Sequence, residues 1–514
     1  MGTVSFSQLR EAYKVFVYHG FTYQQTSEGV DITFHFDIPG LTSFSPSLQV
    51  PGDSWDIIQD PSSSLGQAFV YSIGLVELVS YWKSVCSPVI LLPGALLDDK
   101  QIEFWHNLYY DGLGEFFFTN GIDVDREDMV TILDRERMNE SYNESIQRSL
   151  KEAGIKTRSA GTHDVPLDLR SGAFADVPSH SLNRKELLIP VGGGKDSIVS
   201  LERLSRQREM KRLAFALNPT EAVRASIRTA GIHEKDTRFV RRFFDSELLD
   251  LNRRGFLNGH TPFSALIAFV GAYVAWLGGQ AYVVLSNESS ASESTVRGRN
   301  VNHQYSKSAE FELAVSHYLQ TYLSPELKYF SFLRPVSEIA IARDFAQYTD
   351  YHEVFRSCNK GSKTDSWCGQ CPKCLFVWLI LSPFMKQKTL EKIWGRDLWS
   401  ESGLAKTLQE TVGMSPVKPF ECVGTVAEAS QALGLVLNRK LAAAESLPLL
   451  LEQALQWIKA DQIEHLVFED GSVRWTRQEP SPLESWETGH QGPEQLLPLL
   501  EGINRPYSAD EDMI

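Results

Sequence analysis

The chain has 514 residues, of which 42% are hydrophobic and 11% aromatic. This length and apolar content predict a globular protein of roughly two to four domains. A formal net charge of −15 argues against a nonspecific nucleic-acid binder, and residues 1–10 hold no apolar secretion segment. We therefore expect a cytoplasmic protein with neither nucleic acid nor a membrane as partner.

Residues 1–180 are predicted to form an α+β domain. Alternation of apolar and polar residues predicts strands, and apolar residues at helical spacing predict helices. The strands are expected at residues 13–19, 30–36 and 89–92, and the helices at residues 65–82 and 102–120. The polar stretch at residues 156–183 is expected to be a linker or loop.

A regular alternation of strands and helices predicts a second domain over residues 186–385. Strands are expected at residues 187–191, 213–217, 237–240 and 281–286, with helices at residues 196–207, 221–230 and 262–277 between them. Repeated units of this kind predict an α/β fold with a doubly wound parallel sheet, which binds ligands at the carboxyl ends of its strands. Residues 386–514 are predicted to be mostly helical, with a mobile polar tail from residue 504.

One apolar stretch, residues 266–285, is as long as a membrane span. Gly278 and Gly279 interrupt it, and the apolar residues before them are too few to cross a bilayer. We therefore predict a buried helix over residues 261–277, then a turn and a strand over residues 281–285.

Residues 191–197, Val-Gly-Gly-Gly-Lys-Asp-Ser, carry the strongest functional signal. They join a predicted strand to a predicted helix, so that backbone N–H groups and a helix N-terminus favour an anion at one place. The glycines allow close approach to a phosphate, and Lys195 and Ser197 add a positive charge and a hydroxyl. Asp196 fits poorly beside a bare phosphate, which predicts a metal ion or a ribose hydroxyl as well.

The spacing of this loop matches neither a Walker loop nor a dinucleotide-binding motif. It resembles the pyrophosphate loop of the N-type ATP pyrophosphatases, whose usual form is Ser-Gly-Gly-x-Asp-Ser. Gly192 stands where that form has serine. The resemblance implies an ATP-pyrophosphatase-like fold for residues 186–385.

Four of the six cysteines lie close together in the pattern C-x9-C-x2-C-x2-C: Cys358, Cys368, Cys371 and Cys374. In an intracellular chain such clustered thiols indicate a metal rather than disulfides. Four thiolates suit a structural, tetrahedral Zn²⁺, and an iron–sulfur cluster is the alternative. A pyrophosphate loop followed by such cysteines also resembles the 7-cyano-7-deazaguanine synthases.

Further segments resemble a narrower family, the ATP-dependent UDP-N-acetylmuramoyl-L-alanyl-L-glutamate epimerases of peptidoglycan biosynthesis. The segments are residues 109–115, 191–197, 302–308, 333–340, 357–359, 367–374 and 418–424. The resemblance implies an isomerase that converts the terminal L-Glu of UDP-MurNAc-L-Ala-L-Glu to D-Glu through an acyl-adenylate, releasing AMP and pyrophosphate.

The same resemblance implies ATP, Mg²⁺ and a structural Zn²⁺ as cofactors, and a place for residues 1–180 on the substrate side. It also implies a pathway link to a UDP-MurNAc-L-alanine–L-glutamate ligase. The chemistry is consistent, because an ionised carboxylate keeps the neighbouring Cα–H extremely weakly acidic. Adenylation removes that negative charge and makes an enolate accessible.

Two sets of site residues follow from the loop, the strand ends and the polar segments. The nucleotide-binding set is Gly192, Gly193, Gly194, Lys195, Asp196, Ser197, Asn287, Glu288 and Arg334. The catalytic set is Lys195, Asp196, His303, Lys307 and Cys422. Histidine carries protons near neutral pH, arginine can bind a carboxylate with two hydrogen bonds, and thiols serve as bases in amino-acid racemases.

Purely structural roles for these residues remain open. They are a polar loop around Glu288, a solvated helix start at His303, a surface salt bridge at Arg334 and a buried inert thiol at Cys422. Two other functions also remain open. One is another ATP-pyrophosphatase enzyme, a nitrile synthase or a tRNA-modifying enzyme, and the other is a zinc-stabilised adenine-nucleotide sensor without chemistry.

Overall fold

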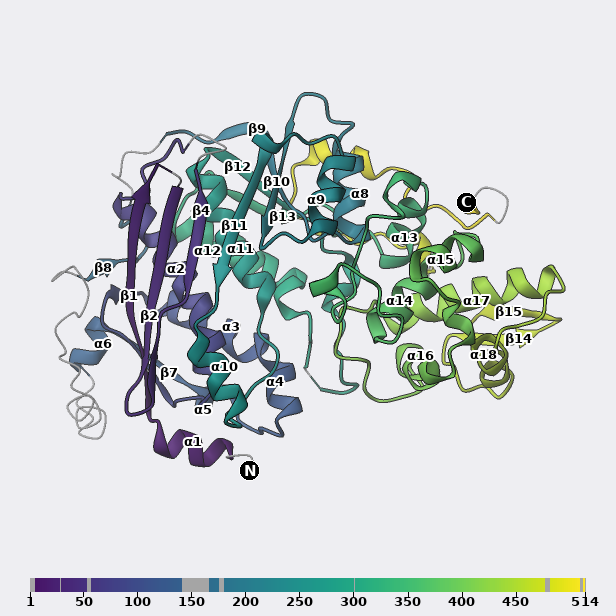
Figure 1. Cartoon of the computed structure of the whole chain (residues 1–514), viewed down its shortest axis with the longest axis horizontal. Coiled ribbons are helices and arrows are strands. Elements are labelled where there is room, and N and C mark those ends of the chain that lie inside the picture. Colours follow the sequence, from purple (N-terminus) through teal and green to yellow (C-terminus); the bar gives the residue numbers. More distant parts are fainter. Residues whose placement is uncertain are drawn as a thin grey trace. The chain divides into compact units, whose positions relative to one another are not determined.

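The computed structural model of the whole chain describes residues 5–27, 29–52, 57–140, 166–174, 180–299, 301–476, 481–508 and 512–513 (Figure 1). Unit 1 comprises Met1–Leu188, Glu234–Val283 and Glu310–Tyr329, and unit 2 comprises Ile189–His233, Val284–Ala309 and Phe330–Ile514. Much of the predicted linker (residues 156–165 and 175–179) lies outside the described residues, as do residues 509–511 and 514 of the predicted tail. The three-domain division stays a prediction.

Unit 1 is built around a mixed sheet with the strand order β11-β4-β2-β1-β5-β7. Its strands are β1 (Val15–Thr26), β2 (Gly29–Ile38), β3 (Thr42–Phe44), β4 (Ser47–Pro51), β5 (Val89–Leu92), β7 (Thr131–Asp134) and β11 (Thr237–Phe243). β1 and β2 pair antiparallel, whereas β1, β5 and β7 run parallel. β9 (Asn183–Pro190) pairs parallel with β12 (Gln280–Leu285). The α/β class predicted from the sequence is confirmed in this mixed form, whereas the doubly wound parallel sheet stays a prediction.

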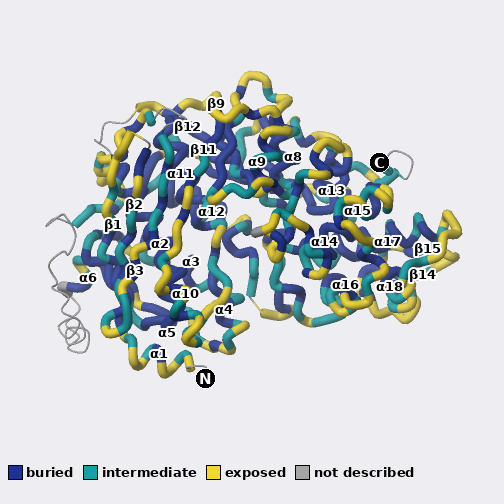
Figure 2. Tube along the Cα trace, in the orientation of Figure 1, coloured by how far each residue is buried: buried dark blue, intermediate teal, exposed yellow. Residues whose placement is uncertain are grey.

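Two apolar helices supply the core of unit 1 and are buried along most of their length (Figure 2). They are α2 (Ser64–Trp82) and α11 (Phe263–Leu277), which pack together through rings such as Phe69 and Trp276, whose centroids lie 5.1 Å apart. Gly279, at φ +74°, turns the chain between α11 and β12. The predicted helix–turn–strand is therefore confirmed, and none of the helices among the described residues is long and apolar enough to cross a membrane.

The remaining elements of unit 1 are mostly short, but two of them pack on this core through Trp105 and Tyr318, whose ring centroids lie 5.2 and 5.6 Å from that of Phe269 in α11. The remaining elements are α1 (Phe6–Ala12), β6 (Ala95–Leu96), α3 (Asp99–Gly112), α4 (Gly114–Thr119), α5 (Arg126–Met129), α6 (Arg135–Glu140), β8 (Leu167–Asp168), α10 (Ser246–Arg253), α12 (Ala309–Tyr322) and β13 (Lys328–Ser331). The single helix predicted over residues 102–120 is wrong, because the chain breaks at Leu113 into α3 and α4. Gly112 before the break packs against Pro262, where a Cβ would lie only 3.0 Å from the ring.

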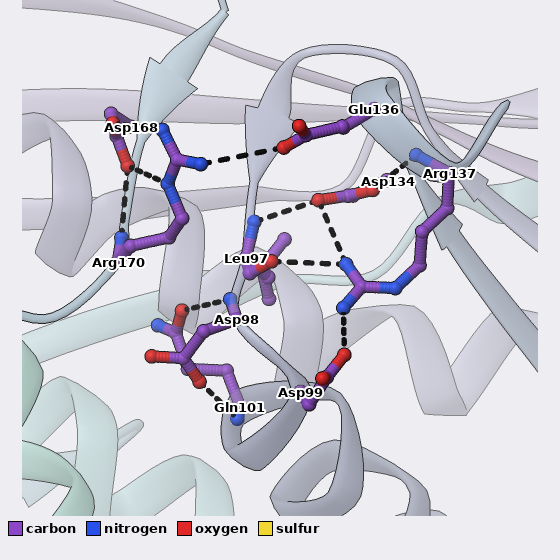
Figure 3. Close-up of polar contacts among 9 residues, drawn as sticks. All are labelled: Leu97, Asp98, Asp99, Gln101, Asp134, Glu136, Arg137, Asp168 and Arg170. Atoms are coloured by element: carbon purple, nitrogen blue, oxygen red, sulfur yellow. Dashed lines mark hydrogen bonds and ion pairs between the residues drawn. The ribbon is translucent and has the colours of Figure 1, made fainter. Parts of the chain in front are cut away.

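A buried carboxylate, Asp134, organises the end of β7 (Figure 3). It accepts hydrogen bonds from the backbone N–H groups of Leu97 and Arg137, each at 2.9 Å, and forms an ion pair with the Arg137 side chain at 3.1 Å. Arg137 also contacts Asp99 at the start of α3. One carboxylate therefore holds together three segments: the end of β7, the start of α6 and the residues that precede α3.

A second buried ion pair yields a stability prediction. The Arg242 guanidinium donates to Glu77 Oε1 at 2.9 and 3.1 Å, and the two residues are 8% and 1% exposed. Because Glu77→Gln would remove the carboxylate that pairs with the buried Arg242, we expect a loss of about 3 kcal/mol in the free energy of unfolding, measured by urea denaturation. Glu221→Gln, which breaks the exposed pair with Arg228, is the control and should have little effect. Equal effects of the two changes would contradict this prediction.

Unit 2 contains the glycine-rich loop and most of the later helices. Its elements are α8 (Lys195–Leu204), β10 (Lys211–Leu217), α9 (Glu221–Thr229), α13 (Glu338–Ala346), α14 (Pro372–Leu381), α15 (Gln387–Trp394), α16 (Ala405–Thr411), α17 (Val426–Ala442), α18 (Leu449–Lys459), β14 (Leu466–Glu469) and β15 (Ser472–Trp475). Among the described residues of the predicted C-terminal region, helices are the predominant elements. The hairpin of β14 and β15 was not predicted, although Asp470 and Gly471, both with positive φ, form the Asp-Gly turn typical of such hairpins.

Candidate functional site

The glycine-rich loop in unit 2 is held in place by contacts that need small residues. Gly193 adopts φ +76°, and its carbonyl accepts a hydrogen bond from the Arg356 backbone N–H at 2.9 Å. Gly194 is the N-cap residue of α8, and a Cβ there would lie 2.9 Å from Ser357 Oγ. A Cβ on Gly192 would meet open space. The loop therefore leaves room for a ligand beside the N-terminus of α8.

The hydroxyl of Ser197 has a local partner in the structure. Its Oγ donates to the Gly194 carbonyl at 3.0 Å, and the residue is 5% exposed. The predicted phosphate contact of Ser197 stays a prediction, because a hydroxyl can also rotate toward a ligand.

Three carboxylates converge beside the loop: Asp196 in the first turn of α8, Glu288 after β12 and Glu338 at the start of α13. One oxygen from each lies within 4.8 Å of the others. The Lys195 ammonium contacts Asp196 and lies 2.9 Å from Glu338 Oε1. The other Glu338 oxygen is buried without a hydrogen-bond partner.

The electrostatics of this cluster indicate a shortage of positive charge. Burial and the charge of Asp196 raise the pKa of Glu338 to about 7, against the opposing effect of Lys195. Burial and Asp196 likewise raise the pKa of Glu288. Burial would also raise the pKa of Asp196, but Lys195 and Lys373 hold it below its usual value. A bound cation would relieve the repulsion among the three carboxylates.

The cluster fits Mg²⁺ by the chemistry of its donors. Carboxylate oxygens are preferred ligands of Mg²⁺. One oxygen from each carboxylate lies within 4.8 Å of the others. This limit includes the roughly 3 to 4 Å between ligand oxygens around an octahedral Mg²⁺.

A second cluster surrounds Cys422. The Lys307 ammonium lies 3.3 Å from Cys422 Sγ, and His303 Nε2 lies 3.9 Å from the same sulfur. Lys373, in the first turn of α14, donates to the Cys422 carbonyl. Burial raises the pKa of the Cys422 thiol, but Lys307, the hydrogen bond with His303 and Lys373 outweigh it and lower the pKa to about 5. A pKa of about 5 favours the thiolate form of Cys422 at neutral pH.

This ionisation yields a testable pH dependence. Only the thiolate is nucleophilic, so alkylation of Cys422 by iodoacetamide should increase as pH rises through about 5 and level off above it. Removing a neighbouring cation by Lys307→Gln should move the midpoint upward by about one unit or more. Peptide mass spectrometry measures the rate at each cysteine. Cys86, whose pKa burial raises, is the internal control, and a Cys422 midpoint near that of a free thiol would contradict the assignment.

Arg334 joins the two clusters through the backbone. Its guanidinium donates to the carbonyls of Glu288 and Lys307, both at 2.7 Å, and the residue is 5% exposed. Arg334 therefore positions residues of both clusters, while its predicted contact with a ligand carboxylate stays a prediction. Asn287 lies half-buried directly before Glu288.

The four clustered cysteines are arranged as a single metal ion requires. Their sulfurs all lie within 4.8 Å of one another, with Cys358 and Cys371 at 3.8 Å and Cys368 and Cys374 at 3.7 Å. A tetrahedral zinc–thiolate centre sets sulfur separations of about 3.8 Å. The geometry favours one ion over a cluster in which each thiolate binds a different iron.

The cysteine segment also supports the glycine-rich loop. Arg356 and Ser357, which contact the loop, directly precede Cys358. Asp365, within the same segment, accepts hydrogen bonds from the N–H groups of Glu221 and Ala222 at the start of α9. The cysteine segment is thereby tied to the loop before α8 and to the start of α9.

Three residues of the site were not predicted as members of it. Glu338 lies within residues 333–340, one of the segments that resemble the epimerase family, and Lys373 lies between two predicted metal ligands. These neighbouring residues could have drawn attention to both positions. Glu428 Oε1 accepts the Glu338 backbone N–H at 2.6 Å, and its Oε2 accepts the Thr425 N–H at 2.7 Å in a capping box on α17. One buried carboxylate thus holds the first turns of α13 and α17.

The fold and these clusters define a mixed α/β enzyme with an ionised thiol beside a lysine–carboxylate site. Comparison with known proteins gives its family. Residues 7–332 match the model described as the MurL N-terminal domain, and residues 354–463 match the MurL C-terminal domain. The chain belongs to the MurL epimerase family, whose members are isomerases. No solved structure matches the chain.

Three relatives carry the name UDP-N-acetyl-alpha-D-muramoyl-L-alanyl-L-glutamate epimerase. The protein of Xanthomonas oryzae pv. oryzae is 31% identical over 401 residues, covering 76% of this chain and 79% of the relative. That of Salinispora tropica is 38% identical over 275 residues, covering 52% and 59%. That of Micromonospora sp. is 39% identical over 285 residues, covering 54% and 63%. The family resemblance stated from the sequence is confirmed.

Proposed function

We propose that this protein is an ATP-dependent epimerase of peptidoglycan biosynthesis. It converts the terminal L-Glu of UDP-MurNAc-L-Ala-L-Glu to D-Glu through an acyl-adenylate and releases AMP and pyrophosphate. The observation that carries the proposal is that Lys307 connects two clusters. It lies 3.3 Å from the Cys422 sulfur and also interacts electrostatically with Glu288 and Asp196. Groups suited to a nucleotide and groups suited to proton chemistry are therefore neighbours in one unit.

The nucleotide half of the proposal rests on an ATP-pyrophosphatase-like arrangement around α8. The N–H groups of the loop and of the first turn of α8 cradle the pyrophosphate, because a helix N-terminus favours an anion. Lys195 and Ser197 add a charge and a hydroxyl. Asp196, Glu288 and Glu338 hold Mg²⁺, which when bound neutralises phosphate charge. The four cysteines hold a structural Zn²⁺, and residues 1–180 lie on the substrate side.

The proton half of the proposal uses Cys422, His303 and Lys307. Adenylation removes the negative charge of the α-carboxylate, after which a nearby base can take the Cα proton. Lys307 and Lys373 place positive charge where an enolate oxygen would develop, which lowers the barrier to its formation. A ligase that joins L-Glu to UDP-MurNAc-L-alanine would supply the substrate.

The test uses the purified protein with ATP, Mg²⁺ and UDP-MurNAc-L-Ala-L-Glu in D₂O. We expect AMP release, D-Glu in the recovered dipeptide and deuterium at its Cα. AMP release without inversion would retain adenylation chemistry and move the substrate elsewhere, as in another ATP-pyrophosphatase enzyme. Neither AMP nor deuterium exchange would contradict the proposal and favour a nucleotide sensor.

A further inference from the structure

The cluster at Cys422 contains more functional groups than the removal of a proton requires. The thiol is ionised, a histidine lies 3.9 Å from the sulfur, and a lysine lies 3.3 Å from it. A nucleophile with an adjacent histidine and stabilising cations is the usual composition of an acyl-transfer site. In the neighbouring cluster, which Lys307 links electrostatically to Cys422, one Glu338 oxygen is buried without a hydrogen-bond partner.

The spacing argues against Cys422 and His303 acting as the two bases of one inversion. Bases on opposite faces of a Cα must each approach it to about 3 to 3.5 Å, and so lie about 6 to 7 Å apart. The sulfur and the imidazole nitrogen are separated by only 3.9 Å. The pair can therefore serve one face of the substrate, and its two members are suited to different tasks.

The ionisation of Cys422 suits a nucleophile better than a base. A thiol with a pKa of about 5 is almost fully ionised at neutral pH, which favours attack on an activated carbonyl. The same pKa makes the thiolate a weak acceptor for a carbon-bound proton, because proton transfer is best driven by a base with a pKa near the working pH.

We propose that Cys422 takes the glutamyl group from the adenylate as a thioester, and that inversion occurs on this covalent intermediate. The inference rests on the proposed function, which supplies the acyl-adenylate. The Cys422 sulfur forms a bond to the acyl carbon, the bond from that carbon to the phosphate oxygen breaks, and AMP leaves with the electron pair. No proton is transferred in this step, because the sulfur is already ionised.

The later steps restore the thiolate. A thioester acidifies its Cα–H, because sulfur conjugates weakly with the carbonyl. His303 receives the Cα proton, and a proton from solvent is added to the opposite face. Water then forms the new bond to the acyl carbon, and the carbon–sulfur bond breaks with its electron pair on sulfur. Both water protons pass to solvent, as does the proton that His303 received. The products are the free carboxylate and the ionised thiol.

The experiment separates this thioester from a thiolate that acts only as a base. Wild type, Cys422→Ala, His303→Gln and the control Cys86→Ala are each given ATP, Mg²⁺ and UDP-MurNAc-L-Ala-L-Glu. Exchange of labelled pyrophosphate into ATP measures adenylation, and AMP release measures the step after it. Mass spectrometry of acid-quenched enzyme measures acylation of each cysteine.

The thioester predicts that Cys422→Ala keeps pyrophosphate exchange and loses AMP release by about a hundredfold or more. It also predicts that wild type, and more strongly His303→Gln, carries the substrate mass less one water on the Cys422 peptide. Release of AMP without inversion by Cys422→Ala would overturn the thioester and assign Cys422 as a base.

The measurement on unaltered enzyme covers the case in which Cys422→Ala fails to fold. Single-turnover AMP formation by wild type, with every cysteine peptide at its unmodified mass, would also overturn the thioester while leaving the proposed function intact. Absence of pyrophosphate exchange in wild type would instead overturn the proposed function, and the thioester with it.

Discussion

Replacement of Asp196 by asparagine is expected to lower pyrophosphate exchange into ATP by about 10² to 10³-fold. Asp196 interacts with every other charged group named in this cluster. It contacts Lys195, and its charge contributes to the raised pKa values of Glu288 and Glu338. Asparagine keeps the shape of the side chain and removes the charge that would hold a cation. The loss should therefore appear in the exchange rate rather than in folding.

Two measurements make the Asp196→Asn result specific. Magnesium titration should show a weakened dependence of the exchange rate on Mg²⁺, while the thermal unfolding midpoint stays close to that of wild type. Asp461→Asn is the matched control, because Asp461 is exposed and its positive φ is tolerated by asparagine. Full exchange activity in Asp196→Asn would contradict the placement of the nucleotide site.

Loss of the metal at the four cysteines is expected to have the second large effect. Replacing Cys358 by serine, or removing the metal with a chelator, should eliminate about one bound zinc per chain and destabilise the segment by several kcal/mol. Cys358 is 3% exposed, and its sulfur accepts the Gly361 N–H at 3.2 Å. Without the metal, the contacts of Arg356 and Ser357 with the glycine-rich loop lose their support.

The readouts are metal content, unfolding midpoint, proteolysis within residues 356–371 and pyrophosphate exchange. We expect all four to change together in Cys358→Ser, with exchange falling by at least about tenfold. Cys86→Ser, a buried cysteine of unit 1, should keep the metal and most of the exchange activity. Retention of zinc and activity in Cys358→Ser would mean that the cysteines do not form one metal centre.

Local patterns predicted the elements whose signals are contained within a short stretch of sequence. Gly278 and Gly279 divide one apolar stretch into two parts, which predicted a helix, a turn and a strand. The structure has α11 before the glycines and β12 after them. The split between α3 and α4 could not be predicted in this way. Its cause includes packing of Gly112 against Pro262, a residue 150 positions away along the chain.

The residues of the candidate site likewise divide into those that local sequence predicted and those that it did not. Lys195 and Asp196 belong to a motif and were predicted, as were Cys422, His303 and Lys307 from their chemistry and the family resemblance. Glu338 has an ordinary helix-start sequence, Ser-Glu, and nothing within its own segment distinguishes a cluster carboxylate from a helix cap. Only the three-dimensional approach of α13 to α8 separates these interpretations.

The interleaving of the two units along the chain has a consequence for synthesis on the ribosome. The glycine-rich loop is translated near residue 192, but its supporting residues Arg356 and Ser357 and the four cysteines appear more than 150 residues later. Unit 1 is likewise incomplete until Tyr329 has been made. The nascent chain therefore carries the glycine-rich loop without its supporting residues for much of its elongation, a condition that favours chaperone engagement.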